Sequence, residues 1–405
     1  MTDAGVGPRD IPSAQPHGER SRRTMADTLL NDDYRGLFLA DVPLLDVRAP
    51  CEFAQGAFPN ARNLPLLDDA ERHEVGLVYK RSGPAAAIAL GQTLVGGATR
   101  ETRLQAWLDW CDQHPEGQLY CFRGGMRSMT VQQWLAEAGR PIPRIHGGYK
   151  TMRRFLLESL EENAAALPLI LLSGRSGTGK TRVIAGLAQA VDLEDLARHR
   201  GSAFGRRPGG QPSQIDFENA LAIRLLRLQE RQQRYGPLPV VVEDESKLVG
   251  HRLIPPVLYL QMQAAPRVLI EEPMEERVQV GLEDYVQQPL AEYARSHGEH
   301  DALPRLGSEL LASLDRIRNR LGDARHRELR QSLTRALEIQ AHSGDLDAHR
   351  GWIRELLSGY YDPLYDHALR ARGSVANTLF AGTRSQVTAF LQDLVSRPRF
   401  AGSRH

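Results

Sequence analysis

The sequence predicts an α/β protein with two units, an N-terminal domain built on a parallel sheet and a second α/β domain that carries a helical block. Three observations lead to this fold class. Short apolar runs alternate with helical stretches over most of the chain, as in parallel sheets covered by helices. A glycine-rich segment at 174–181 follows one of these runs. From about residue 275 to 370 the apolar residues recur with helical spacing.

The N-terminal domain is predicted over residues 28–160, after a polar tail. Residues 1–27 are rich in Pro, Gly and Arg and lack the apolar core of a signal peptide, so a flexible tail is expected. Within the domain, two apolar runs predict buried strands, and one amphipathic stretch predicts a helix that ends at a glycine. These elements are Pro43–Val47, Gln118–Tyr120 and Arg127–Ala138 with Gly139.

The second domain is predicted over residues 165–405, beyond a seam at Asn163–Pro168. A further strand is expected at Val375–Phe380, followed by a last helix through Val395. The helical stretch at about 275–370 is predicted to be an insertion in this domain or a lid on it. Its leucines are expected to form a core, with an apolar ligand-binding trough as the alternative. Three apolar, β-branched runs suit a buried parallel sheet; they are Leu169–Leu172, Pro239–Glu243 and Arg267–Ile270.

The amino-acid composition limits which partners and which cellular compartment are expected for this chain. The chain carries 51 Lys and Arg against 50 Asp and Glu, a net charge of +1, so any contact with nucleic acid must come from local patches. Three cysteines are too few for a disulfide scaffold and match no zinc spacing, so no structural metal is expected. The small number of cysteines predicts a reducing, cytoplasmic compartment. No apolar run is long enough to span a bilayer, so no membrane partner is expected.

The clearest motif is a phosphate-binding P-loop. Residues 174–181 fit the pattern G-x-x-x-x-G-K-[ST] between an apolar strand and a helical stretch. Glycines allow backbone N–H groups to turn toward phosphate oxygens, and the helix N-terminus adds a partial positive charge. The lysine would neutralise the terminal phosphates. The predicted phosphate-binding residues are Gly174, Ser176, Gly177, Thr178, Gly179, Lys180 and Thr181.

A candidate Mg²⁺ site accompanies the P-loop. The Thr181 hydroxyl can ligate an ion that travels with the phosphates. Asp244 directly follows the apolar strand Pro239–Glu243, where a Walker-B carboxylate is expected. The alternative for the acidic run Glu243–Glu245 is a solvated strand end.

A second motif begins at Cys121, between a short strand and a helix. Loop N–H groups that point at the sulfur, the helix dipole and Arg127 favour a thiolate, which predicts a nucleophile. Catalytic roles are therefore predicted for Cys121 and Arg127, whereas Cys111 and Cys51 are predicted to be structural. The same loop amides can hold an oxyanion; the loop consists of Phe122, Arg123, Gly124, Gly125 and Met126.

The N-terminal motifs resemble those of rhodanese domains. Leu45–Phe53 and Gly56–Pro65 are similar to the opening signature of that family, and Cys121 matches its sulfur-carrying cysteine. Five residues separate Cys121 from Arg127, whereas sulfurtransferase loops usually have four. This C-x5-R length resembles that of cell-cycle phosphatases and arsenate reductases, and it suits a phosphate-sized or selenophosphate-sized group. The resemblance implies a rhodanese-like parallel-sheet domain followed by a P-loop NTPase-like α/β domain with a helical C-terminal block.

A rhodanese-like domain fused to a P-loop domain resembles the tRNA 2-selenouridine synthases, over about Asp33 to Phe380. The resemblance implies an enzyme that replaces sulfur by selenium in the wobble-position 2-thiouridine of tRNA. It implies selenophosphate and geranyl diphosphate as co-substrates, with a geranylated 2-thiouridine intermediate. The implied partners are tRNA and a supplier of selenophosphate.

Contact with tRNA would come from local arginine clusters, because arginine suits bidentate contacts to phosphate. Candidate contacts are Arg198, His199, Arg200, Arg206 and Arg207. A second arginine-rich stretch runs from Arg305 to Arg335. The alternative for both clusters is that they form a solvent-exposed helix face without contacting RNA. A wobble base must be splayed out of its stack, and aromatic side chains can hold it. Candidates for this stacking are Phe122, Tyr149 and Phe204.

Two other functions fit the same motifs. The first is a C-x5-R phosphatase, reductase or sulfurtransferase fused to a P-loop kinase or NTPase, which keeps Cys121, Arg127 and Lys180 in their roles and needs no RNA. The second is a rhodanese-like sensor module that controls an NTPase. The P-loop alone does not separate them, because it contacts phosphates and can hold ATP, GTP or a prenyl diphosphate.

Overall fold

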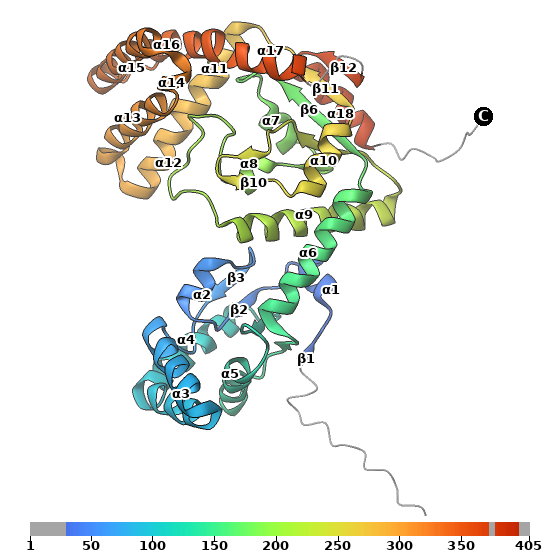
Figure 1. The fold of residues 1–405 in the computed structure, drawn as a ribbon, viewed down its shortest axis with the longest axis vertical. Helices are drawn as coiled ribbons and strands as arrows, with labels where there is room; N and C mark the ends of the chain where they lie inside the picture. Colours follow the sequence, from blue (N-terminus) through green and yellow to red (C-terminus); the bar gives the residue numbers. More distant parts are fainter. Residues whose placement is uncertain (1–29, 372–376, 397–405) are drawn as a thin grey trace, which may run out of the picture.

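The computed structural model describes residues 30–371 and 377–396 of the chain. The tail predicted at 1–27 lies outside these residues, as do the first two positions of the strand predicted at Val375–Phe380. Figure 1 shows two α/β units connected by one long helix, α6 (Gly148–Ala166), with α9 (Gln214–Tyr235) packed against it. The α/β class with parallel sheets and a helical C-terminal part is confirmed.

The N-terminal unit contains a five-stranded parallel sheet with the strand order β1-β5-β4-β2-β3. β4 (Gln118–Tyr120) has the bounds expected from the sequence, and β2 (Leu44–Asp46) lies inside the predicted Pro43–Val47. α5 (Met126–Glu137) begins one residue before the predicted helix. The remaining elements are β1 (Leu30–Asn31), α1 (Tyr34–Leu39), α2 (Pro50–Gln55), β3 (Ala61–Asn63), α3 (Asp69–Leu94), α4 (Gly97–Gln113) and β5 (Arg144–Ile145).

The second unit contains a five-stranded parallel sheet with the order β12-β11-β6-β8-β7. The chain leaves the central strand β6 (Leu169–Gly174) for β7 and β8 on one side and later for β11 and β12 on the other. Such a reversal opens a crevice at the carboxyl end of the central strand, and the P-loop follows β6 directly into it. The other elements are α7 (Lys180–Ala185), β7 (Ala190–Val191), α8 (Leu193–Leu196), β8 (Val240–Glu243), β9 (Leu248–Val249), β10 (Arg252–Leu253), α10 (Pro256–Ala264), β11 (Arg267–Ile270), β12 (Thr378–Gly382) and α18 (Arg384–Ser396).

The helical block lies between β11 and β12, which pair with each other, so it is an insertion between neighbouring strands. Leu310, Leu314 and Leu333 are buried in its core, as their spacing predicts. None of the described helices is both long enough and apolar enough to cross a membrane. The block contains α11 (Met274–Leu282), η2 (Glu283–Gln287), α12 (Gln288–His297), α13 (Glu299–Arg316), α14 (Arg318–Leu321), α15 (Asp323–Ser343), η3 (Asp347–His349), α16 (Arg350–Leu356), η4 (Leu357–Tyr361) and α17 (Asp362–Ala371).

Helices α6 and α9 hold the two units together, and apolar residues from both units form one continuous core. The buried Asn219 of α9 donates to the carbonyl oxygen of Ala57 at 2.7 Å and accepts a hydrogen bond from Arg153 at 2.8 Å. Asp216 accepts a further bond from the Ala57 N–H at 2.6 Å. Since α6 runs to Ala166, the seam expected at Asn163–Pro168 begins within a helix.

We expect Asn219→Ala to destabilise the chain by about 1–3 kcal/mol, because it leaves the buried Ala57 carbonyl without its donor. It also removes one of the two side-chain acceptors of Arg153, which keeps its ion pair with Glu218. Urea unfolding followed by circular dichroism measures this. Asn319→Ala, at an exposed position outside the interface, is the control and should change stability by less than about 0.5 kcal/mol. Equal unfolding midpoints for the two variants would contradict the role of Asn219.

Candidate active site

The P-loop connects β6 to α7, so its N–H groups surround the space in front of a helix N-terminus. Gly177 has a φ of 81°, and a side chain there would come within 2.7 Å of the Arg277 carbonyl oxygen, so glycine is required. Lys180 Nζ donates to the carbonyl oxygen of Gly174 at 3.0 Å. The loop therefore holds its ammonium group where phosphates would bind.

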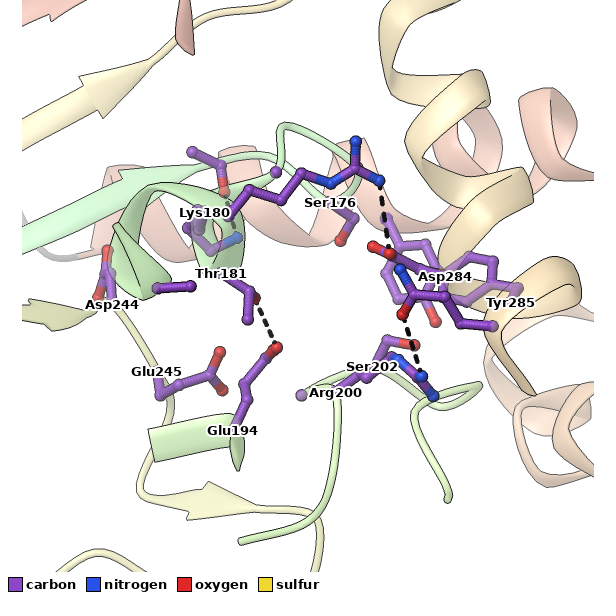
Figure 2. A pocket seen from close by; sticks show the side chains of 18 of the residues that line it. Ser176, Lys180, Thr181, Glu194, Arg200, Ser202, Asp244, Glu245, Asp284 and Tyr285 are labelled. Atoms are coloured by element: carbon purple, nitrogen blue, oxygen red, sulfur yellow. Dashed lines mark hydrogen bonds and ion pairs between the residues drawn. The ribbon is translucent and has the colours of Figure 1, made fainter. Parts of the chain in front are cut away.

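The P-loop forms one wall of a pocket of about 400 Å³, which is shown in Figure 2. This size is typical of small-ligand sites. Facing the loop are the segment around Arg200 and Ser202 and the helix η2, which carries Asp284 and Tyr285. The charged residues of the lining are Lys180, Arg182, Arg200, Arg207, Glu194, Asp244, Glu245 and Asp284.

Thr181 lies between two buried carboxylates. Its Oγ is 3.0 Å from Glu194 Oε2 and 3.1 Å from Glu243 Oε1, and its one proton can be donated to either. Burial is the main cause that raises the pKa of Glu194 to about 7. Burial, with repulsion from Glu194, raises the pKa of Glu243 well above its usual value. The pair therefore favours a bound proton or a cation between its oxygens.

This arrangement fits Mg²⁺, which prefers carboxylate and hydroxyl oxygens and keeps phosphates or water in its remaining positions. No group of three or more His, Cys, Asp or Glu side chains within the described ranges could hold a metal ion, so substrate oxygens would have to complete the shell. Asp244, predicted as the ligand, lines the pocket and accepts a hydrogen bond from Ser173 at 2.7 Å. Sequence reasoning missed Glu243 and Glu194. Glu243 could have been identified because it is a carboxylate at the end of an apolar strand. No sequence pattern that predicts a ligand contains Glu194.

Cys121 directly follows β4, at the carboxyl end of the central strand of the N-terminal sheet. Its side chain is buried, and Sγ lies 3.1 Å from the hydroxyl of Ser128 in the first turn of α5. Gly148 has a φ of 58°, and a side chain there would lie 2.2 Å from the Cys121 carbonyl oxygen. The start of α6 therefore packs directly against the base of the cysteine loop.

Arg127 is paired with a carboxylate that sequence reasoning missed. Its two terminal nitrogens lie 2.5 Å and 3.1 Å from the oxygens of the buried Glu52, and Arg72 lies 3.3 Å from the same carboxylate. Burial lowers the pKa of Arg127, but the hydrogen bonds and the charge of Glu52, together with Cys121 and Asp46, outweigh it and raise the pKa. Glu52 lies within the rhodanese-like segment Leu45–Phe53, and this membership could have identified it as a site residue. Both partners line a pocket of about 460 Å³ beside α3.

The other two cysteines are less suited to nucleophilic chemistry. Burial raises the pKa of the Cys111 thiol to about 11. A hydrogen bond to Asp69 raises the pKa of Cys51. Since a thiolate is the reactive form, Cys121 is the candidate nucleophile of the three.

Four of the five predicted tRNA contacts line two adjoining pockets. Arg200 and Arg207 line the P-loop pocket, and each is paired with a carboxylate. His199 and Arg206 line the neighbouring pocket, whereas Arg198 lines neither and donates to a backbone carbonyl. Burial, together with the charge of Arg206, lowers the pKa of His199 to about 4, so its imidazole is neutral at pH 7.

The aromatic side chains predicted to stack on a base are largely covered. Phe204 is buried, with its ring centroid 5.6 Å from those of both Tyr285 and Trp352, and it offers no free face. The Arg48 guanidinium lies 3.8 Å from the ring centroid of Tyr149. Phe122 stacks on the same ring with centroids 6.1 Å apart.

Comparison with known proteins establishes the family. The family described as tRNA 2-selenouridine synthase AAA domain matches residues 167–397, more than half of the chain. The chain belongs to the tRNA 2-selenouridine synthase family. It is 57% identical to the tRNA 2-selenouridine synthase of Alcanivorax borkumensis, over 89% of this chain and 98% of that protein. The protein of the same name from Pseudomonas syringae pv. syringae is 48% identical over 91% of this chain and 99% of its own.

Among solved structures, the N-terminal domain of a protein from Clostridium difficile 630 matches 29% of this chain and 89% of its own length. The identity is 33% and the TM-score is 0.26, which is too low for the match to bear on the fold. The rhodanese likeness of the N-terminal unit therefore stays a prediction that rests on its motifs.

Replacing Glu194 by glutamine tests the buried carboxylates. The pKa of Glu194 is about 7 in the folded chain against a usual value of 4.5, so the folded state holds an extra proton and loses stability as the pH rises between these values. Glutamine keeps a partner for Thr181 and does not titrate. We expect it to stabilise the chain at pH 8 by on the order of 2–3 kcal/mol, and not at pH 4.5.

Thermal melting curves recorded in EDTA at both pH values measure the effect. The control is Glu276→Gln at an exposed position, for which we expect no pH-dependent change in stability. A stability difference between Glu194→Gln and the original chain that is the same at both pH values would show that the carboxyl group does not titrate in this range.

Proposed function

We propose that this chain replaces the sulfur of wobble-position 2-thiouridine in tRNA by selenium, with selenophosphate as donor, by way of a geranylated intermediate made from geranyl diphosphate. The observation that carries the proposal is family membership over nearly the whole length of its relatives, which are named tRNA 2-selenouridine synthases. Two separate anion cradles, one after β6 and one after β4, support it because both co-substrates carry phosphate groups.

In the first step the P-loop holds geranyl diphosphate through Lys180, Thr181 and the loop amides. The thiocarbonyl sulfur bonds to C1 of the geranyl group as the C1–O bond breaks, and diphosphate leaves with the bonding electrons. N3 of the base loses its proton to solvent, which leaves the S-geranyl base neutral. Lys180 stabilises the charge that develops on this leaving group. Mg²⁺ held by Thr181, Glu194 and Glu243 would neutralise further charge on the diphosphate.

In the second step the Cys121 loop holds selenophosphate, and Cys121 assists delivery of the selenium. Attack of the thiolate on phosphorus breaks the P–Se bond, and the selenium leaves with the bonding pair. It then bonds to C2 of the base as the geranyl thiolate departs, and N3 regains a proton from solvent. Water releases phosphate from Cys121. This route balances without an external oxidant, whereas a Cys121-bound selenium formed with release of phosphate would need one.

The groups around the sulfur suit this step. The Ser128 hydroxyl, 3.1 Å from Sγ, can donate to the sulfur when it carries charge. Glu52 holds Arg127 at the loop, where its guanidinium can neutralise the transferred phosphoryl group. A protein that supplies selenophosphate remains a predicted partner, and the cytoplasm remains the predicted location.

Cys121→Ser should abolish selenation and leave geranylation intact, because serine lacks the thiolate and the P-loop is unchanged. The measurement is nucleoside mass spectrometry after incubation with 2-thiouridine tRNA, geranyl diphosphate and selenophosphate. Cys51→Ser is the control and should make 2-selenouridine at the normal rate. Full selenouridine formation by a folded Cys121→Ser chain would refute the role of Cys121. Failure of the unaltered chain to convert intact tRNA would refute the proposed function.

Lys180→Ala should slow geranylation by at least about 100-fold, since the developing charge on the diphosphate loses a preorganised cation. When tRNA that is already geranylated is supplied, the same variant should still form 2-selenouridine, because that step uses the other cradle. Lys247→Ala, at an exposed position, is the control. If Lys180→Ala instead blocked both steps equally while remaining folded, the division of labour between the two cradles would be disproved.

A further inference from the structure

A second pocket of about 630 Å³ adjoins the P-loop pocket. Its size lies within the range of small-ligand sites. Because the two pockets have a common wall, a group bound in one lies beside a group bound in the other. The residues that line both are Ser176, Gly201, Ser202, Asp244, Glu245, Tyr361 and Tyr365.

The part of the second pocket away from the P-loop is basic. Its lining there consists of the exposed residues Arg206, His251, Arg316 and Arg320. Arg316 pairs with Glu309 at 2.8 Å. The side chains of Arg206 and Arg320 make no hydrogen bond or ion pair with any described residue, so their guanidinium groups are available to an anion.

The floor of the second pocket is aromatic and contains polar atoms that lack partners. Tyr360, Tyr361 and Tyr365 line it, and the buried Oη of Tyr365 has no hydrogen-bond partner among the described residues. The same holds for Nδ1 of His199, whose side chain is only 7% exposed. Buried polar atoms are normally paired, so these two point to a ligand with hydrogen-bonding groups.

The acidic residues of the second pocket lie on the wall that it shares with the P-loop pocket. A side chain at Gly201 would come within 2.4 Å of Glu194 Oε1 and 2.9 Å of Glu245 Oε1, so both carboxylates gather at this wall. Figure 2 shows Glu245 on the same side as Glu194 and Thr181. The charged side chains of the pocket are therefore separated, with carboxylates on the P-loop side and arginines on the outer side.

We propose that this second pocket receives the tRNA nucleotide that is modified and presents it to the group held by the P-loop. Flanking phosphates lie on Arg206, Arg316 and Arg320, the base lies against the tyrosines, and its polar edge pairs with His199 and Tyr365. This proposal rests on the proposed function. Arginines for phosphates and aromatic rings for splayed bases are the chemistry of single-stranded RNA recognition. A prenyl tail would leave the arginines and the two unpaired polar atoms without partners.

Binding of the tRNA substrate tests the basic side of this pocket in the full chain. We expect the double variant Arg206→Ala/Arg320→Ala to weaken binding about 20-fold at 0.15 M salt and to lower the slope of log Kd against log salt by about 1.5, as for two lost phosphate contacts. The matched control is Arg295→Ala/Arg370→Ala, which removes the same charge from the same helical block at exposed positions outside both pockets and outside the predicted arginine clusters. It should bind within about twofold of the unaltered chain.

A cross-link tests the aromatic floor. A tRNA with 5-iodouridine at the wobble position, irradiated in complex with the full chain, should attach to a peptide that contains Tyr361 or Tyr365. The inference is overturned if no cross-link falls in this pocket, or if the Arg206→Ala/Arg320→Ala variant binds tRNA with unchanged affinity and salt slope. The two proposals fail separately, because an unaltered chain that forms 2-selenouridine upholds the proposed function whichever result this pocket gives.

Discussion

The first turn of an α-helix has N–H groups that no carbonyl within the helix can reach, and both candidate sites depend on this constraint. The P-loop places such groups after β6, and the cysteine loop places them after β4, in each case beyond the carboxyl end of a strand with a neighbour on both sides. Both loops are tightly packed from outside, by the Arg277 backbone at Gly177 and by Gly148 at Cys121. Their shape is therefore fixed before a ligand arrives, which reduces the entropy lost on binding.

The helical insertion completes the P-loop site as well as covering the sheet. The buried Arg277 of α11 donates from Nε to the Ser176 carbonyl oxygen at 3.0 Å, and its terminal nitrogens contact the Asp362 carboxylate of α17 at 2.5 Å and 3.0 Å. One guanidinium thus joins the P-loop to both ends of the insertion. The insertion also supplies Asp284 and Tyr285 to the P-loop pocket and Arg316 and Arg320 to the pocket beside it. A change in how these helices pack would therefore reach both pockets.

The sequence predicted those features that are formed by residues adjacent to one another along the chain. The P-loop is eight consecutive residues, and the strand at Gln118–Tyr120 is a short apolar run, so each is visible locally. The partners Glu194 and Glu52 were not predicted, because they reach Thr181 and Arg127 from other parts of the chain. The base-stacking role of Phe204 failed for a related reason, since only the fold shows that Tyr285 and Trp352 enclose its ring.

The separation of the two cradles constrains the chemistry that the proposed function requires. The pocket beside Arg127 shares no lining residue with the P-loop pocket or its neighbour, and Figure 1 shows the two loops in different units with α6 and α9 between them. Since the two cradles lie in different units, the proposed function requires the product of the first step to reach the second cradle, either by rebinding or by a swing of the RNA. A thioether at C2 suits this transfer, because it is neutral and its carbon–sulfur bond persists in water until a selenium nucleophile displaces it. A charged, labile phosphoryl intermediate on the base would not survive the same journey. Within the proposed function, an alkylated intermediate therefore suits the two-unit architecture better than a phosphorylated one.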